Sequence, residues 1–283
     1  MFHLGVVQFS RGQPLGDILS EADEALALAE NRGPNAWWSI EKETQVDSLP
    51  GEQWKALLSK AVQGGGVKLA FYPVVWQKGG LLHQEGVIRL ETERDKPLLP
   101  AGDFMHIAAH LHLTAPLDLA VIKRAIEAMA QMPSDIAVNL SAETINNWTF
   151  RNDLAALLRT QPDVCRRLWV EVPEYGALKH FDAFKDLCRG LKDLGCRVGV
   201  EHFGLCLTES QKFTELGIDY VKIDPLLIRG IDTHQGNQEF LRSFCRVAHT
   251  FGIAVVAVGV QNQAEVDTVH ELGVDGATGP AIG

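Results

Sequence analysis

From residue 67 onward, short apolar runs alternate with longer segments in which apolar side chains recur every three or four residues. The first pattern predicts buried β-strands and the second predicts amphipathic helices. The expected strands are 69–76, 81–90, 136–140, 168–172, 197–201, 220–224 and 253–260. The expected helices are 104–113, 116–131, 151–160, 180–194, 208–216, 236–251 and 262–272. This alternation predicts an α/β protein with a parallel sheet and helical crossovers.

About seven such repeats between residues 67 and 283 favour a closed, TIM-like (β/α) barrel. An open, doubly wound sheet is the alternative. It is less favoured because no GxGxxG motif follows an early strand.

The first 66 residues divide into two parts. Residues 4–9 predict a strand, and residues 16–31 predict an amphipathic helix that Gly33 and Pro34 terminate. A single strand–helix–strand unit cannot bury a core of its own, so residues 1–38 are expected to be the end of a larger domain. Residues 39–66 predict a polar linker followed by a helix that begins near Glu52. The barrel domain is therefore expected to span residues 67–283.

Composition narrows the classes of function. The 283 residues contain 26 Lys and Arg against 36 Asp and Glu, which leaves a net charge of −10 and argues against DNA as a partner. No apolar run is long enough to span a membrane, and the N-terminus lacks a secretory signal. The five cysteines are scattered without a CxxC pair, which is typical of reduced cysteines in the cytoplasm.

Polar side chains recur where the expected strands end. They are Asn139, Glu171, Glu201, Lys222 and Asp224, with Glu85 and Arg89 on the second strand. In a barrel these strand ends meet at one mouth, so the side chains should gather there. Carboxylate and amide oxygens suit Mg²⁺ or Ca²⁺, and the two cations suit a phosphate. Any one of these residues is more simply read as a strand end facing water, but the repetition argues against that for all of them.

Short motifs around these residues fall in a familiar order. They are FYPVV (71–75), EGVIR (85–89), Pro100 with Phe104, VNLS (138–141), EVPE (171–174), EHFG (201–204), VKID (221–224) and AVGVQ (257–261). By these motifs the stretch 67–283 resembles an EAL domain, the cyclic-di-GMP phosphodiesterase barrel. Residues 1–38 are similar to the end of a GGDEF domain, without the signature motif of that domain.

Departures from the EAL pattern fall on positions that hydrolysis needs. Glu201 and His202 stand where active relatives have two aspartates, Val258 replaces a glutamate, and Thr278 replaces a glutamine. Valine binds no metal, and histidine is a poor ligand for Mg²⁺. Two-metal hydrolysis needs both ions. The sequence therefore predicts a degenerate phosphodiesterase rather than an enzyme, with no catalytic residues.

The degenerate pattern is most similar to that of the LapD-type receptors. This resemblance implies that the barrel binds cyclic-di-GMP without hydrolysing it. It also implies autoinhibition by the protein's own GGDEF domain, possible pairing of EAL domains, and a role in biofilm control. The chain would then be the cytoplasmic portion of an inner-membrane protein, with a membrane-spanning region outside this sequence. The implied ligand-binding residues are Tyr72, Glu85, Val87, Arg89, Pro100, Asn139, Glu171, Glu201, His202, Lys222, Asp224 and Gly259.

Several carboxylates facing an anionic ligand would repel it unless a positive charge intervenes. A single Mg²⁺ or Ca²⁺ could be held by Glu85, Asn139, Glu171 and Glu201. Alternatively, Lys222 and His202 could neutralise part of the cluster, and no metal cofactor would be required. We prefer the second arrangement. Equal affinity for the nucleotide in chelator and in millimolar metal would exclude the first.

Two other functions stay open. One is a protein-interaction scaffold that has lost the ligand, like the degenerate GGDEF–EAL proteins that direct RNA turnover. The other is a weak cyclic-di-GMP phosphodiesterase that uses one metal and His202.

Overall fold

The computed structural model describes residues 3–7, 9, 15–31, 37–40, 51–92, 96–205, 212–213 and 215–283. The chain forms two compact units, one of residues 1–68 and 89–117 and the other of residues 69–88 and 118–283. Most of the linker expected at 39–50 and most of the helix expected at 208–216 lie outside the described residues. The domain boundaries expected from the sequence stay predictions.

The first unit begins with a strand–helix–strand motif. Strand β1 (Leu4–Val7) pairs in parallel with β2 (Trp37–Ile40), and helix α1 (Leu15–Asn31) packs against both strands. Gly5 permits this close approach, because a Cβ atom at that position would lie 2.5 Å from the carbonyl oxygen of Ala22. The strand and helix expected at the start of the chain are therefore confirmed.

The rest of this unit consists of short elements around α3 (Met105–His110), which contacts both α1 and α2 (Gly51–Gly64). A two-residue strand, β5 (Leu99–Pro100), and a 3₁₀ turn (Ala101–Asp103) precede α3. Among the described residues of the whole chain, no helix has the length and apolar character to cross a membrane.

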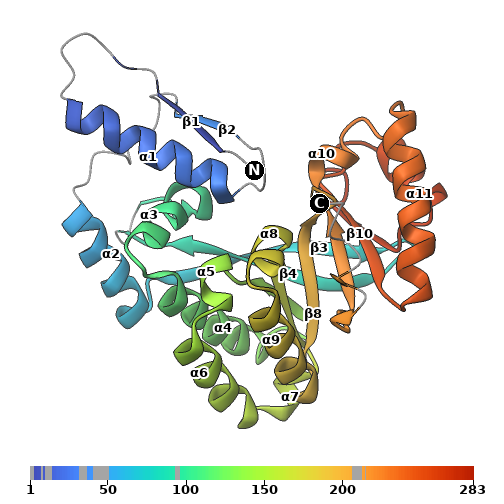
Figure 1. Ribbon diagram of the computed structural model, residues 1–283. Helices are drawn as coiled ribbons and strands as arrows, with labels where there is room; N and C mark the ends of the chain where they lie inside the picture. The colour runs from blue at the N-terminus through green and yellow to red at the C-terminus, as the bar shows by residue number, and fades with distance from the viewer. Residues whose placement is uncertain are drawn as a thin grey trace. The chain divides into compact units, whose positions relative to one another are not determined.

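Eight strands close into a barrel in the order β3-β11-β10-β9-β8-β7-β6-β4, with β3 also pairing with β4 (Figure 1). The strands are β3 (Val67–Trp76), β4 (Leu81–Leu90), β6 (Ile136–Asn139), β7 (Leu168–Pro173), β8 (Arg197–Phe203), β9 (Tyr220–Ile223), β10 (Ala254–Val258) and β11 (Gly276–Thr278). The TIM-like barrel and its seven expected strands are confirmed. The sequence analysis missed β11, because three small residues carry no strand pattern.

The barrel is the expected parallel sheet except at β3. Strand β3 runs antiparallel to β11, whereas the other seven barrel strands, β4 and β6 to β11, are parallel to one another. The reason is the connection from β3 to β4, a tight turn in which Gly79 and Gly80 take positive φ values. So short a turn can join only antiparallel strands.

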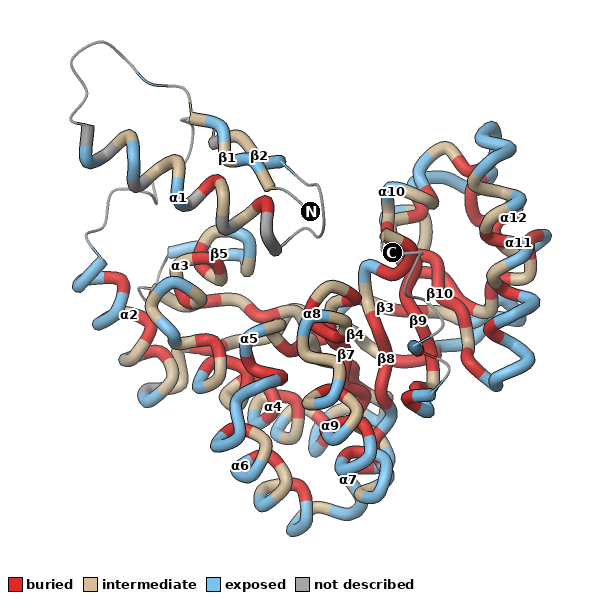
Figure 2. Tube along the Cα trace, in the orientation of Figure 1, coloured by how far each residue is buried: buried red, intermediate tan, exposed pale blue. Residues whose placement is uncertain are grey.

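Helices connect most of the parallel strands and cover the outside of the barrel, where buried strands lie inside exposed helix faces (Figure 2). They are α4 (Thr114–Met129), α5 (Ala142–Ile145), α6 (Trp148–Arg159), α7 (Pro162–Cys165), α8 (Glu174–Lys179), α9 (Phe181–Asp193), α10 (Pro225–Ile228), α11 (Gln235–Thr250) and α12 (Gln263–Glu271). Asparagine side chains cap α6 and α12: Asn147 accepts a hydrogen bond from the backbone N–H of Phe150, and Asn262 accepts one from Glu265.

The interior of the barrel is layered. An apolar layer is formed by Val74, Leu82, Ala137, Trp169, Tyr220 and Val256. Side chains on a strand return to the same face every second residue. The next inward positions on four of these strands are therefore occupied by Asn139, Glu171, Lys222 and Val258. This alternation places a second layer of mostly polar side chains, called the polar layer below, directly above the apolar layer.

Candidate functional site

Lys222 lies between two carboxylates at the centre of the polar layer. Its ammonium nitrogen is 2.7 Å from Oε2 of Glu85 and 2.7 Å from Oε2 of Glu171. The Lys222 and Glu171 side chains are 2% and 0% exposed, so this ion pair is shielded from water. Glu85 and Lys222 are 137 residues apart in the chain, and barrel closure brings them together.

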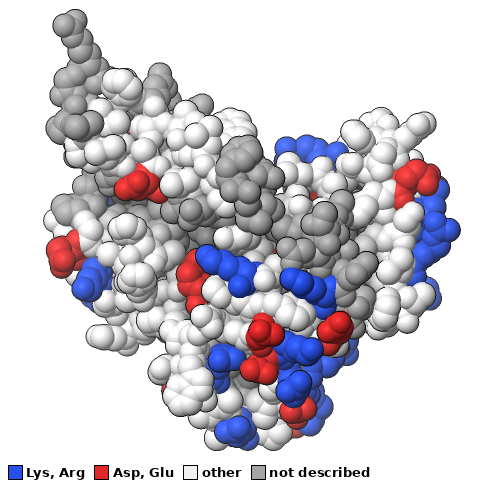
Figure 3. Space-filling view, in the orientation of Figure 1, with Lys and Arg blue, Asp and Glu red and all other residues white. Residues whose placement is uncertain are grey.

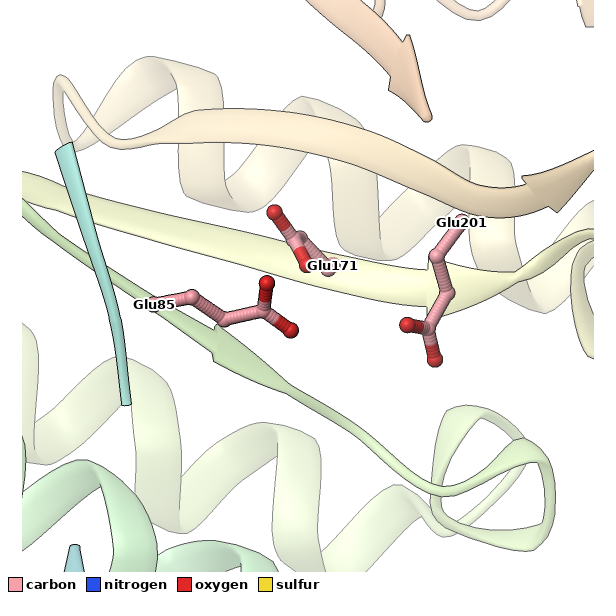
Figure 4. A group of neighbouring side chains, drawn as sticks. All are labelled: Glu85, Glu171 and Glu201. Atoms are coloured by element: carbon pink, nitrogen blue, oxygen red, sulfur yellow. The ribbon is translucent and has the colours of Figure 1, made fainter. Parts of the chain in front are cut away.

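Strand register sets the neighbours of this pair. Asn139 on β6 stands opposite Glu171 on β7, and the Asn139 amide donates a hydrogen bond of 3.2 Å to Oε1 of Glu85. Glu201 follows on β8 opposite Pro173. One carboxylate oxygen from each of Glu85, Glu171 and Glu201 lies within 4.8 Å of the others, and Figure 4 shows the three groups converging. The gathering of these predicted residues is therefore observed.

His202 and Asp224 form a second pair at the rim. The Nδ1 atom of His202 lies 2.8 Å from Oδ2 of Asp224, while Oδ1 of Asp224 accepts the backbone N–H of Leu226 and caps α10. His202 adopts a positive φ of 53°, beside a register shift between β8 and β9. More than half of its side chain is exposed. His202 therefore presents an imidazole to solvent where the family pattern has a carboxylate.

Burial and neighbouring charges shift the pKa values of the carboxylates in opposite directions. Burial alone would raise the pKa of Glu85, but the charge and hydrogen bond of Lys222 outweigh burial and lower it. Burial raises the pKa of Glu171 to about 7; the charge of Lys222 opposes this rise, and the charges of Glu85 and Glu201 add to it. Burial also raises the pKa of Glu201. The cluster therefore holds less negative charge than three free carboxylates.

The neighbouring carboxylates raise the pKa values of the two cationic side chains. Burial would lower the pKa of Lys222, but the charges of Glu171 and Glu85 raise it, so the ammonium form is stable. The hydrogen bond to Asp224 raises the pKa of His202 to about 9, against the opposing effect of burial. Both side chains are therefore positively charged at neutral pH, as one of the two arrangements inferred from the sequence requires.

Sequence reasoning missed Tyr220 and His83, which lie beneath this layer. The Tyr220 hydroxyl donates a hydrogen bond of 2.6 Å to Oε1 of Glu171. The His83 ring is fully buried, 4.5 Å from the Trp169 ring between centroids, and burial keeps its pKa well below the usual range. The position of Tyr220 could have revealed this contact. Tyr220 lies two residues before Lys222 on β9, so both side chains point into the barrel. A buried phenol hydroxyl needs a hydrogen-bond partner, and the polar residues at the strand ends supply one.

A hollow of about 310 Å³ lies beside Glu85. Its lining includes Glu85, Tyr72, Val258, Gly259 and Thr278, so three predicted ligand residues and two of the departures from the EAL pattern share one cavity. Gly259 has a φ of 81°, which glycine adopts without strain. The walls are mostly apolar, which suits the flat face of a ring better than a metal ion.

Three other predicted ligand residues lie on β4 or its neighbour. Val87 alternates with Glu85 along β4 and therefore faces the same side of the strand. Arg89 stands opposite Pro100 in the antiparallel pair of β4 and β5, within the first compact unit. Their part in ligand binding stays a prediction.

Several residues of the cluster could hold a divalent metal ion. The three carboxylates are close enough for a divalent cation, and Oδ1 of Asn139 is a buried atom without a partner among the described residues. Hydrogen bonds from protein donors orient both oxygens of Glu85 and both oxygens of Glu171. Each of these oxygens keeps a second lone pair for a metal ion. Val258 and His202 offer no carboxylate at their positions.

Charges on the surface are mixed. On the face shown in Figure 3, Lys and Arg side chains over α6, α7 and α9 are interspersed with Asp and Glu. Ion pairs such as Arg166–Asp163 and Arg189–Asp186 account for part of this pattern. This face therefore offers no continuous basic surface for nucleic acid.

The protein is thus a closed α/β barrel with carboxylates that converge at the carboxyl ends of its strands. A family model for the EAL domain matches residues 55–283. The chain belongs to the EAL domain family.

Curated relatives of the chain have different functions. It is 25% identical over 286 aligned residues to the RNase E specificity factor CsrD of Escherichia coli, covering 99% of this chain and 43% of the relative. It is 27% identical over 231 residues to the cyclic di-GMP phosphodiesterase PdeF of Escherichia coli, covering 80% of this chain and 31% of the relative. The chain thus spans less than half the length of these relatives.

Among solved structures, the fold is similar to the S helix–GGDEF–EAL portion of Vibrio cholerae LapD bound to cyclic-di-GMP. The TM-score is 0.86 at 24% identity, over 96% of this chain and 67% of that one. This likeness supports the fold that the sequence predicted.

Proposed function

We propose that this chain is a catalytically inactive EAL domain that binds cyclic-di-GMP as a signalling receptor. The observation that carries the proposal is the replacement of metal-binding groups at the mouth. His202 is paired with Asp224, and Val258 lines an apolar cavity, so neither position offers a carboxylate to a metal ion. Hydrolysis by two metals would lack the carboxylates that a second ion needs.

The side chains that would bind cyclic-di-GMP, in contrast, are still present. His202 supplies positive charge for a phosphate, and the cavity beside Glu85 supplies apolar walls for a base. The motif EGVIR keeps Arg89, which the EAL resemblance assigns to ligand binding. By analogy with LapD, the receptor would be autoinhibited by its own GGDEF domain. Binding would release that contact, allow EAL domains to pair, and signal through a membrane-spanning region to a periplasmic output that controls adhesion. We place this chain on the cytoplasmic side of the inner membrane.

The test is a calorimetric titration with cyclic-di-GMP, in chelator and in millimolar Mg²⁺, with analysis of the recovered nucleotide. We expect binding and intact nucleotide in both buffers. Arg89→Ala should weaken binding by about 100-fold, because it removes a charge-assisted contact to phosphate. Arg189→Ala, on the exposed face of α9, is the matched control. Rapid conversion to the linear dinucleotide would contradict the proposal.

A second candidate is a protein-interaction scaffold that needs no nucleotide. The match to CsrD, which covers 99% of this chain, favours it. An absence of binding in either buffer, with a folded protein, would select this candidate. The relation to PdeF keeps residual hydrolysis as a third outcome. In that case slow formation of the linear dinucleotide should disappear in Glu171→Ala.

A further inference from the structure

A buried carboxylate outside the strand-end cluster holds the turn that follows Asn139. Asp118, on α4, is 3% exposed. Its Oδ2 atom accepts the backbone N–H of Ser141 at 2.9 Å, and its Oδ1 atom accepts the Ser141 hydroxyl at 3.1 Å. Burial raises the pKa of Asp118 to about 7, although these hydrogen bonds oppose the rise. Burying a carboxylate is unfavourable unless hydrogen bonds compensate, and Asp118 receives two of them from one residue.

Ser141 departs from the usual behaviour of a serine at the start of a helix. It is the N-cap residue of α5, a position from which a serine hydroxyl commonly accepts a backbone N–H of the first turn. Within the described residues 141–145, the Ser141 side chain accepts no such hydrogen bond. Its hydroxyl donates to Asp118 instead. The serine therefore fastens the turn to α4 rather than to the helix that it begins.

This turn carries Asn139. Only Leu140 separates the two residues, and its backbone N–H donates to the carbonyl oxygen of Glu171 at 2.8 Å. The side-chain amide of Asn139 then reaches Oε1 of Glu85 at 3.2 Å. That distance is already at the long end for an N–H···O hydrogen bond, so a small shift of the turn would break it.

Helix α5 is held a second time, by α8. Gly176 on α8 lies directly against Ala142, the first residue of α5. A Cβ atom at position 176 would lie 2.7 Å from the Cβ atom of Ala142. Close packing on α8 and the hydrogen bonds from Ser141 to Asp118 together leave the turn little freedom to move.

We propose that Asp118 is a positioning residue for the mouth of the barrel: by holding Ser141, it fixes Asn139 where the Asn139 amide reaches Glu85. The inference deepens the proposed function and rests on it for the ligand, cyclic-di-GMP. Asp118 lies outside the motifs that led to the EAL resemblance, and its role comes from its two contacts with Ser141.

The test compares Asp118→Ala with Asp118→Asn. Alanine removes both acceptors, whereas asparagine keeps an oxygen for the Ser141 N–H and offers an amide to the Ser141 hydroxyl. We measure the side-chain amide resonances of Asn139 by NMR, assigned by their loss in Asn139→Ser, and the affinity for cyclic-di-GMP by calorimetry. Asp118→Ala should shift or broaden these resonances and weaken binding at least about tenfold. Asp118→Asn should keep the wild-type resonances and an affinity within about threefold of the wild type.

The matched control is Asp135→Ala. Asp135 precedes the other end of β6, and its Oδ2 atom accepts the indole N–H of Trp169 at 3.1 Å. This change also removes a carboxylate acceptor beside the same strand, so it should lower stability. It should leave the Asn139 resonances and the nucleotide affinity as they are in the wild type.

A second variant covers the case in which Asp118→Ala does not fold. Ser141→Ala removes only the hydroxyl contact, so it should shift the Asn139 resonances in the same direction but less far. Unchanged resonances in whichever of the two variants folds, or equal responses in Asp118→Ala and Asp135→Ala, would overturn the inference. The NMR measurement requires no nucleotide. If cyclic-di-GMP binds to none of these proteins, the proposed function fails while the role of Asp118 is still decided.

Discussion

The ammonium of Lys222 and the carboxylate of Glu171 are 2.7 Å apart in the interior of the barrel, and neither side chain is more than 2% exposed. Removing one partner of such a pair leaves an uncompensated buried charge. We expect Lys222→Met to lower the free energy of unfolding by about 3–5 kcal/mol, measured by urea denaturation.

The control for this change is Lys222→Met/Glu171→Gln, which removes both charges and should regain much of the lost stability. If the free energy of unfolding of Lys222→Met lay within about 1 kcal/mol of the wild-type value, water would have to reach this ion pair, contrary to its burial.

Gly199 is expected to tolerate no larger side chain. A Cβ atom there would lie 2.4 Å from the Tyr220 ring, which cannot move without displacing its neighbours. Gly199→Ala should therefore destabilise the protein by about 1–3 kcal/mol in thermal or urea unfolding. Gly190→Ala, on α9, meets no atom within 4 Å and should instead stabilise the protein by about 0.5–1 kcal/mol. Equal effects of the two substitutions would contradict this packing.

His202 should make stability depend on pH. The pKa of His202 rises from 6.5 to about 9 through its hydrogen bond to Asp224, so its contribution is fully present below about pH 6.5 and is lost as pH rises through about 9. His202→Asn, which suits a positive φ, removes the contribution.

The difference in unfolding free energy between wild type and His202→Asn should therefore shrink from about pH 6 to about pH 10. It should stay below about 1 kcal/mol, because more than half of the side chain is exposed and solvent screens the pair. A difference that grows with pH would have the opposite sign and refute the assignment.

Glu265 holds the loops around α12 together. Its side chain is 2% exposed and accepts backbone hydrogen bonds from Gly230 at 2.8 Å and from Gln261 at 2.6 Å. Glu265→Ala would leave these amides without their acceptor, so we expect a loss of at least about 2 kcal/mol in urea unfolding. Glu271→Ala, exposed at the end of the same helix, should change stability by less than about 0.5 kcal/mol.

Much of this protein follows from the sequence alone. Buried apolar strands separated by amphipathic helices determine an α/β fold with a parallel sheet, because each strand must be covered on both faces. About seven repeats favour closure of that sheet into a barrel. The polar residues at the strand ends, such as Asn139 and Glu171, could be placed at one mouth because parallel strands share their direction. The replacements at His202 and Val258 can also be read directly, since they are changes of residue type in recognisable motifs.

Only the tertiary structure decided how these groups pair. Barrel closure brings Glu85 to Lys222 across 137 residues, a contact that no local pattern encodes. The antiparallel course of β3 depends on a tight turn, and the short β11 carries no periodic signal. The hydrogen bond from Tyr220 to Glu171 depends on the space that Gly199 leaves for the Tyr220 ring on the neighbouring strand. Residue types determine which charges and shapes are available. Whether a hydrogen bond forms, however, depends on differences of a few tenths of an ångström in the donor–acceptor distance, and tertiary packing sets that distance.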